Sequence, residues 1–294
     1  MFRRPSREKE YRRGCFLQVI KVDQPAKMSD GDAGKGTSTS NDSTPSAPPP
    51  NSALQWQAAV EVISARKVDA ALWVTRFLTI IFSLLYLLPI FGPGITFYHR
   101  AFLANAATSA LRLHQRLPRV SLTREFMAQL ISEDSCHYLF YSLIFIYCAP
   151  ITLAILPVLL FAVLHFASFS LTLLDALGRN SAWIGRLFIS LIEFQTVTIL
   201  RMAAGAEIFT MVFVIAYTIM GRASLLTPFI YYRFLTLRYA SRRNHYSRTM
   251  FYELKITAER IAASPKCPGI LVATIHRAIS FISQLAPAVT SAAQ

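Results

Sequence analysis

The densest group of chemically capable side chains lies in the stretch Glu133-Asp134-Ser135-Cys136-His137. A cysteine beside a histidine can act as a nucleophile with its base, and neighbouring acids can bind a metal ion. On a helix, however, Cys136 and His137 would point in different directions, and only Glu133 and His137 would share a face. The two acids also suit the positive end of a helix dipole. We therefore interpret this stretch as the start of a helix. A membrane-bound enzyme that uses these residues is the least favoured of three functional hypotheses.

Other catalytic signatures are missing from the sequence. It contains no HExxH motif, no GxSxG motif and no glycine-rich phosphate loop. The four cysteines lie far apart and form no CxxC pair, so they predict neither a disulfide framework nor a zinc site. We expect a protein that is not an enzyme and that holds no cofactor or metal.

A second kind of candidate is a charged or titratable residue within an apolar segment. Arg76, Arg201 and Glu207 lie in or at the start of segments that are apolar enough to cross a membrane, and His165 lies in another. Ionisable groups inside a membrane often mark a transport path. A lipid or ion transport protein is therefore the second functional hypothesis. For Glu207 itself we expect a plainer role, as the partner of Arg201 or Arg76 or at the membrane interface.

The composition favours a membrane protein. The chain has 294 residues, of which 53% are hydrophobic and only 16% are charged, and its net charge is +14. A strongly basic protein can bind nucleic acid or an anionic membrane. Long apolar runs favour the membrane, and no nucleic-acid-binding motif is present, so we expect no nucleic-acid partner. The predicted fold is an all-α polytopic membrane protein with three to four transmembrane helices and amphipathic surface helices.

The apolar runs divide the chain into three parts. Residues 1–52 are rich in polar residues, glycine and proline, and we expect a disordered arm. Residues 221–294 form a basic tail, which the positive-inside rule places in the cytosol. Within the membrane domain, residues 53–220, we predict spans at about 70–91, at 139–160 and at 199–220. The apolar run that begins at 139 continues to 174, as one span with an interfacial helix or as two short spans. A surface helix is expected at 98–117, either along the membrane or packed on the bundle.

The number of spans decides the side of the N-terminus. Three spans place it in the lumen, and four place both ends in the cytosol. The arginines between Arg100 and Arg124 favour a cytosolic loop and hence three spans, whereas the basic N-terminal arm favours four. Three spans are slightly preferred.

The tail carries the residues that we expect to meet lipid. In the stretch 228–244, aromatic rings alternate with four arginines, as at a membrane interface: Arg233, Arg238, Arg242 and Arg243. Two amphipathic helices are predicted at 247–263 and 269–285. In the second helix, apolar residues share one face and polar residues the other. We expect Leu271, Ile275 and Ile282 to enter the membrane surface and Arg277 to meet anionic headgroups, with packing back against 247–263 as the alternative.

Five segments of the chain resemble the transmembrane protein 33 family, also called the Krüppel homologue 2 or Pom33-type pore membrane family: Leu103–Pro118, Glu133–Tyr138, Pro157–Phe161, Pro228–Asn244 and Phe281–Pro287. The resemblance runs from about Ala70 to Pro287. It implies a multi-pass protein of the endoplasmic reticulum membrane and the nuclear envelope, with roles in reticulon-shaped tubules, nuclear-pore organisation and the unfolded-protein response. It also implies reticulon-type or nuclear-pore membrane proteins as partners. The family supplies no catalytic residue that could be assigned to this chain.

Overall fold

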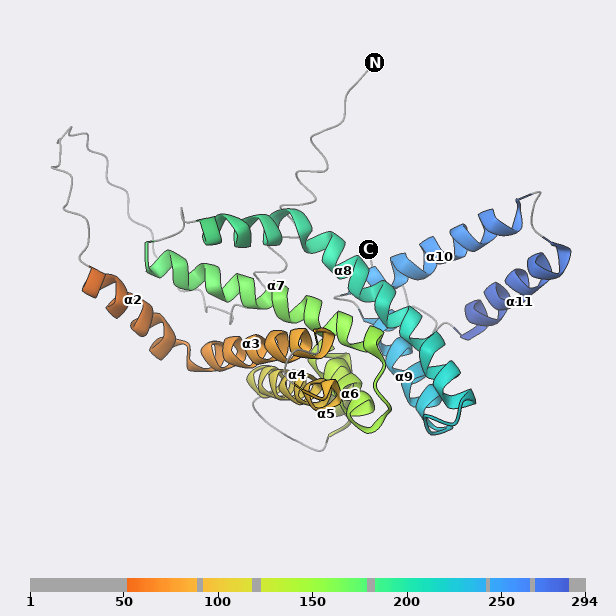
Figure 1. The fold of residues 1–294 in the computed structure, drawn as a ribbon, viewed down its shortest axis with the longest axis horizontal. Coiled ribbons are helices and arrows are strands. Elements are labelled where there is room, and N and C mark those ends of the chain that lie inside the picture. Colours follow the sequence, from red (N-terminus) through yellow and green to blue (C-terminus); the bar gives the residue numbers. More distant parts are fainter. Residues whose placement is uncertain are drawn as a thin grey trace, which may run out of the picture.

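The computed structural model describes residues 52–88, 92–117, 123–178, 183–241, 244–264 and 268–285. In these residues the chain forms ten α-helices, α2 to α11, and no strand (Figure 1). The all-α class predicted from the sequence is thereby confirmed. The arm that was expected to be disordered lies outside the described residues, except that Ser52 begins α2 (Ser52–Ala65).

Three helices in the described part of the chain are long and apolar enough to cross a membrane. They are α3 (Lys67–Leu87), α7 (Thr152–Ala176) and α8 (Trp183–Ile219). α3 and α7 run antiparallel, because Trp73 donates a hydrogen bond to Ser170 at 2.9 Å near one end and Tyr86 contacts Thr152 at 2.9 Å near the other. The chain is therefore a polytopic membrane protein.

The predicted surface helix proves to be a packed part of the bundle. α4 (Gly94–Arg116) folds back along α3, where Thr108 donates a hydrogen bond to Thr75 at 2.9 Å and the rings of Phe82 and Phe97 stack. Tyr98 and other α4 residues are fully buried between α3 and α6. Of the two placements expected for 98–117, along the membrane surface or packed on the bundle, the structure shows the second, because the buried face carries large aromatic residues that packing stabilises.

The apolar run from 139 to 174 is broken rather than continuous. α5 (Arg124–Ser132) is capped by Thr123, and α6 (Asp134–Tyr147) ends just before Pro150. A proline lacks the backbone N–H and restricts the residue before it, so a helix tends to stop there. The candidate span therefore starts at Thr152 rather than at 139, and Pro157 is accommodated inside α7.

α8 is one helix of 37 residues, so the predicted span at 199–220 is the second part of a longer element. No proline interrupts residues 183–219, and a helix of this length is about 55 Å long. After a turn, α9 (Thr227–Ala240) returns along α8 toward the bundle centre (Figure 1).

An aromatic core joins α4, α6 and α9. Its members are buried, and the ring centroids of Tyr141 and Phe145 lie 4.8 Å apart, as do those of Tyr98 and Phe102. Tyr231 and Phe234 of α9 pack against the same rings of α6. This core holds α9 inside the bundle and so fixes the position of the residues that follow on the same helix face.

The two tail helices form a hairpin that projects from the bundle (Figure 1). α10 (Tyr246–Ala262) packs on α8 and on α11 (Gly269–Leu285). Gly205 of α8 allows a close approach, since a Cβ atom there would lie 3.2 Å from the terminal methyl of Met250. α10 and α11 begin and end within one residue of the ranges 247–263 and 269–285 expected from the sequence.

Candidate functional site

Glu207 sits in the middle of the bundle, on the second half of α8, with only 1% of its surface exposed. Its Oε2 atom accepts a hydrogen bond from Nε of Arg238 at 3.1 Å, and the hydroxyl of Tyr138 donates to Oε1. The hydroxyl of Tyr231 donates to the backbone oxygen of Glu207 at 2.7 Å. A buried carboxylate needs such partners, because an unpaired charge in an apolar interior is strongly destabilising.

Arg238 reaches this position because α9 buries one face. Tyr231, Phe234 and Arg238 are three and four residues apart, lie on that face, and are each at most 2% exposed. The guanidinium of Arg238 lies 5.0 Å from the centroid of the Tyr138 ring, and its Nη1 atom lies 3.4 Å from Oδ1 of Asp134. We call the group of Glu207, Arg238, Asp134 and Tyr138 the buried ion network.

Asp134 ties the network to the end of α9. Its Oδ1 atom accepts a hydrogen bond from the hydroxyl of Ser241 at 2.8 Å, and Ser241 also accepts one from the backbone N–H of Asn244. The network therefore connects α6, α8, α9 and the residues that follow α9. Three helices from separate parts of the sequence are held by one set of charges.

Neither of the partners expected for Glu207, Arg201 and Arg76, pairs with it. Arg201 forms an ion pair with Glu253 of α10, and both side chains are partly exposed. Arg76 is buried on α3 and lines a cavity instead. The expectation fails because Arg238 does not lie at the membrane interface. Its spacing from Tyr231 places it on the buried face of α9.

The stretch from Glu133 to His137 behaves as a structural corner. Glu133 accepts a hydrogen bond from Arg116 at 2.7 Å, and Asp134 belongs to the buried ion network. His137 contacts the backbone oxygen of Ile131 through Nε2 at 2.7 Å, and Cys136 is buried separately. α6 begins at Asp134, as the dipole argument predicted, although Glu133 makes no side-chain capping bond. Asp134 and His137 approach each other, with 3.7 Å between Oδ1 and Nδ1, whereas Glu133 and Cys136 lie in separate surroundings.

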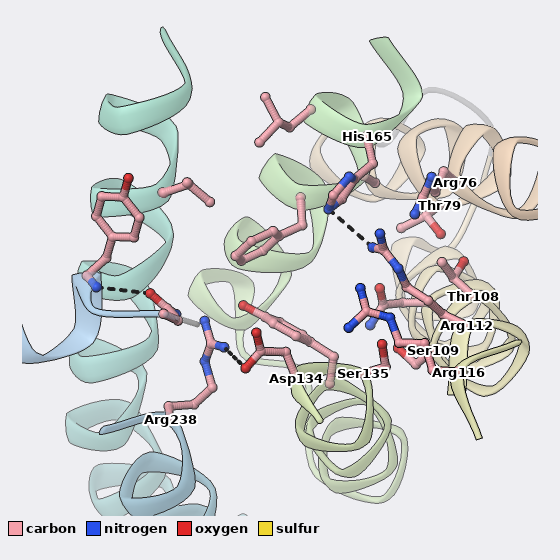
Figure 2. A pocket seen from close by; sticks show the side chains of 18 of the residues that line it. Arg76, Thr79, Thr108, Ser109, Arg112, Arg116, Asp134, Ser135, His165 and Arg238 are labelled. Atoms are coloured by element: carbon pink, nitrogen blue, oxygen red, sulfur yellow. Dashed lines mark hydrogen bonds and ion pairs between the residues drawn. The ribbon is translucent and has the colours of Figure 1, made fainter. Parts of the chain in front are cut away.

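A cavity of about 400 Å³ lies between α3, α4, α7 and the α9–α10 corner (Figure 2). Arg112 and Arg116 of α4 point toward it from one side, and Arg238 approaches from the opposite side. Arg112 contacts Nε2 of His165 on α7 at 3.3 Å. We call this space the arginine cavity.

The arginine cavity was not predicted, although the sequence contains a signal for it. A polar stripe runs along α4 at intervals of three or four residues, and all of its members line the cavity: Asn105, Thr108, Ser109, Arg112 and Arg116. A polar stripe of this kind also suits a surface helix, which is the placement expected for this segment. Of the predicted intramembrane residues, Arg76 and His165 belong to the cavity, whereas Arg201 does not.

The predicted lipid-contacting residues fall into separate groups. Arg233 is exposed on α9, but Arg238 is 2% exposed and is not a surface residue. Arg242 and Arg243 lie outside the described residues. On α11 the expected residues differ in exposure, and those that face solvent are Leu271, Arg277 and Ile282, while Ile275 is half-buried.

The fold and these sites define the class: an all-α, multi-pass membrane protein with a charged network inside its bundle and a tail hairpin outside it. Residues 51–288 match the family described as Transmembrane protein 33/Nucleoporin POM33, and the chain belongs to this family. It is 48% identical to mouse (Mus musculus) and to human (Homo sapiens) Transmembrane protein 33 over 250 residues, which cover 84% of this chain and 99% of each relative. It is 49% identical to Krueppel homolog 2 of Drosophila melanogaster over 227 residues, covering 77% of this chain and 82% of that protein. No solved structure matches the chain.

Proposed function

We propose that this protein is a non-enzymatic organiser of the endoplasmic reticulum membrane and the nuclear envelope. In this proposal the bundle anchors the chain, and the hairpin of α10 and α11 lies against the membrane surface and binds anionic headgroups. Roles in reticulon-type tubules, in nuclear-pore organisation and in the unfolded-protein response, with the corresponding membrane proteins as partners, belong to the same proposal.

The observation that carries the proposal is the exposed apolar surface of α11. Ile270 and Phe281 are 86% and 62% exposed, and Leu271 and Ile282 are also exposed. α10 packs on α11 but leaves these side chains uncovered in the described part of the chain. A helix with an uncovered apolar face and a polar opposite face binds well at a membrane interface.

The names of the relatives support the location. The family description includes a nucleoporin, and the mammalian relatives are named as transmembrane proteins. Transport through Glu207, the alternative function, fits less well, because its carboxylate is enclosed by Arg238 and Tyr138.

The test uses the full chain in nanodiscs with an environment-sensitive fluorophore on α11 at Ala278. We expect the emission to shift to the blue in nanodiscs with anionic lipid, because the fluorophore enters the interface. The double substitution Leu271→Glu with Ile282→Glu should abolish the shift. In cells, the same variant should lose its effect on the balance of tubules and sheets.

A matched control places the same two charges on the polar face, as His276→Glu with Ser280→Glu. It should retain the blue shift, since these residues face away from the apolar surface. Equal loss in both double variants would show that net charge alone governs binding. An unchanged signal in the apolar-face variant would contradict the proposal.

A further inference from the structure

The arginine cavity presents positive charge from several elements. Arg76 comes from α3, Arg112 and Arg116 come from α4, and Arg238 comes from the end of α9 (Figure 2). Asp134 is the one carboxylate among the described residues that line the cavity, but Glu133 and Glu207 outside the lining pair with Arg116 and Arg238. Arg76 and Arg112 therefore contribute most of the remaining positive charge, and arginines that gather around a recess raise the local positive potential and favour an anion within it.

The neutral lining supplies further hydrogen-bond donors. Its uncharged hydroxyl and amide side chains include Asn105, Ser109 and Ser135, whereas Thr79 and Thr108 already donate to carbonyl oxygens of their own helices. A hydroxyl can donate to an anion by rotating, and the guanidinium fork of an arginine matches two oxygens of a phosphate group. The chemistry of the lining therefore fits a phosphate group better than a simple spherical ion.

The cavity is larger than a phosphate group needs. Its volume of about 400 Å³ is in the usual range for sites that hold small organic molecules. One part of its wall is apolar, formed by Phe161, Ala162, Leu164 and Leu200. A ligand that combines a phosphate group with a less polar body would use both parts of the wall.

The depth of Arg76 within the bundle also indicates a functional site. Gln115 donates a hydrogen bond to Asp69 at 3.2 Å, which marks the level where α3 begins and α4 ends. Arg76 lies seven residues further along α3, about 10 Å deeper. An arginine at such a depth in a membrane bundle is costly and marks a functional site by default.

We propose that the arginine cavity binds a phosphate group, held by Arg76 and Arg112 with help from the Ser109 hydroxyl and the Asn105 amide of α4. The phosphate belongs either to the headgroup of an anionic phospholipid or to a small soluble phosphate compound. The site lies inside the bundle, and its test uses variants that leave the apolar face of α11 intact, so it succeeds or fails independently of the tail.

The first experiment measures binding to the full chain in detergent by native mass spectrometry and by the midpoint of thermal unfolding. Phosphatidic acid is compared with diacylglycerol, which has the same acyl chains and no phosphate. Glycerol 3-phosphate and inorganic phosphate are the soluble probes. We expect binding and a raised midpoint with a phosphate-bearing probe and neither with diacylglycerol.

The probes also separate the two sources of phosphate. Binding of phosphatidic acid without binding of glycerol 3-phosphate assigns a lipid headgroup. Binding of glycerol 3-phosphate with the same dependence on Arg112 assigns a soluble compound. Binding of diacylglycerol as strong as that of phosphatidic acid, or binding of no probe, overturns the proposal.

Substitutions then locate the site. Arg112→Gln or Arg76→Gln should weaken binding about tenfold or more, because each removes a charge-assisted hydrogen bond. Arg233→Gln is the matched control, since Arg233 is exposed on α9 and does not line the cavity. Equal effects of Arg112→Gln and Arg233→Gln would place binding on the surface and overturn the proposal.

A variant that fills the cavity keeps the test decisive if an arginine variant does not fold. Ser109→Met keeps all four arginines and adds volume at a residue that lines the cavity. It should block the phosphate-bearing probe while the protein still unfolds cooperatively. Undiminished binding by a folded Ser109→Met protein would contradict the proposed location.

Discussion

Glu207 on α8 and Arg238 on α9 form an ion pair that is almost wholly enclosed, with 3.1 Å between Oε2 and Nε. The two residues are at most 2% exposed and 31 positions apart in sequence. A buried ion pair adds little net stability compared with apolar residues of the same shape, but the loss of one member leaves an uncompensated charge. The pair therefore contributes more to the position of α9 in the bundle than to the free energy of unfolding.

Removing the cation should be strongly destabilising. We expect Arg238→Met to lower the free energy of unfolding by roughly 3–5 kcal/mol, because Glu207 would remain buried without its countercharge. The thermal midpoint in detergent measures the change. Arg233→Met, an exposed substitution on the same helix, should change the midpoint little.

The coupling between the two residues is a separate prediction. Combining Arg238→Met with Glu207→Gln should be less destabilising than the sum of the single variants, by at least about 1 kcal/mol, because the double variant removes both charges. A double-mutant cycle from the four midpoints gives this value. Strict additivity would show that the two side chains do not act as a pair.

The hydroxyl of Tyr231 makes a smaller and more local contribution. It donates to the backbone oxygen of Glu207 at 2.7 Å, and the residue is fully buried. Tyr231→Phe should therefore cost about 1–3 kcal/mol, since a buried acceptor loses a donor while the ring packing stays. Tyr252→Phe, at an exposed residue of α10, is the comparison and should be neutral. A neutral Tyr231→Phe would indicate that this bond contributes nothing.

His137 should make the stability of the bundle depend on pH. Burial lowers its pKa from the ordinary value of about 6.5, and the positive charge of Arg238 lowers it further, while the Ile131 carbonyl, Asp134 and Glu207 act in the opposite direction. A histidine whose folded pKa is depressed takes up a proton more readily when the chain unfolds. Its contribution to stability is therefore complete above about pH 6.5 and is lost as the pH falls toward the folded pKa.

The measurement compares the wild-type chain with His137→Gln. The midpoint of the wild-type protein should fall more steeply between about pH 7 and pH 5 than that of the variant. His276→Gln on exposed α11 should keep the wild-type slope. Parallel slopes for all three proteins would remove His137 as the source of the dependence.

Helical segments could be predicted from the sequence because apolar runs, prolines and charge patterns are local signals. The stop at Pro150 and the bounds of α11 follow directly from such signals. The partner of Glu207 could not be predicted, because three arginines were available and the choice depends on how α9 folds back on α8. The arginine cavity could not be predicted in full either. The polar stripe on α4 is a local signal, but the other walls come from helices whose packing is not set by any local pattern.

Helix directions bear on the question of three or four membrane passes. α4 runs antiparallel to α3 and has a similar length, 23 residues against 21. It therefore returns through the same depth, even though its arginines keep it from resembling an apolar span. α6 and α9 have 14 residues each, about 21 Å, which is shorter than the roughly 30 Å apolar core of a bilayer.

The contacts at the helix ends show where the chain emerges. α4 ends and α6 begins beside the start of α3, because Gln115 contacts Asp69 and Arg116 contacts Glu133. Arg238 at the end of α9 contacts Asp134 at the same level, so the tail after α9 and the start of α3 lie on the same side, and the turn between α8 and α9 lies on the other.

This arrangement also reconciles the charge signals, because it puts the basic residues around Arg116 and the basic tail on one side of the membrane, which the positive-inside rule predicts to be the cytosol. We expect epitopes inserted before Ser52 and after Leu285 to be equally accessible to protease in cells with a permeabilised plasma membrane and an intact reticulum. An epitope in the turn between α8 and α9, at Ser224, should be protected. Protection of the tag before Ser52 together with cleavage of the tag after Leu285 would contradict this arrangement.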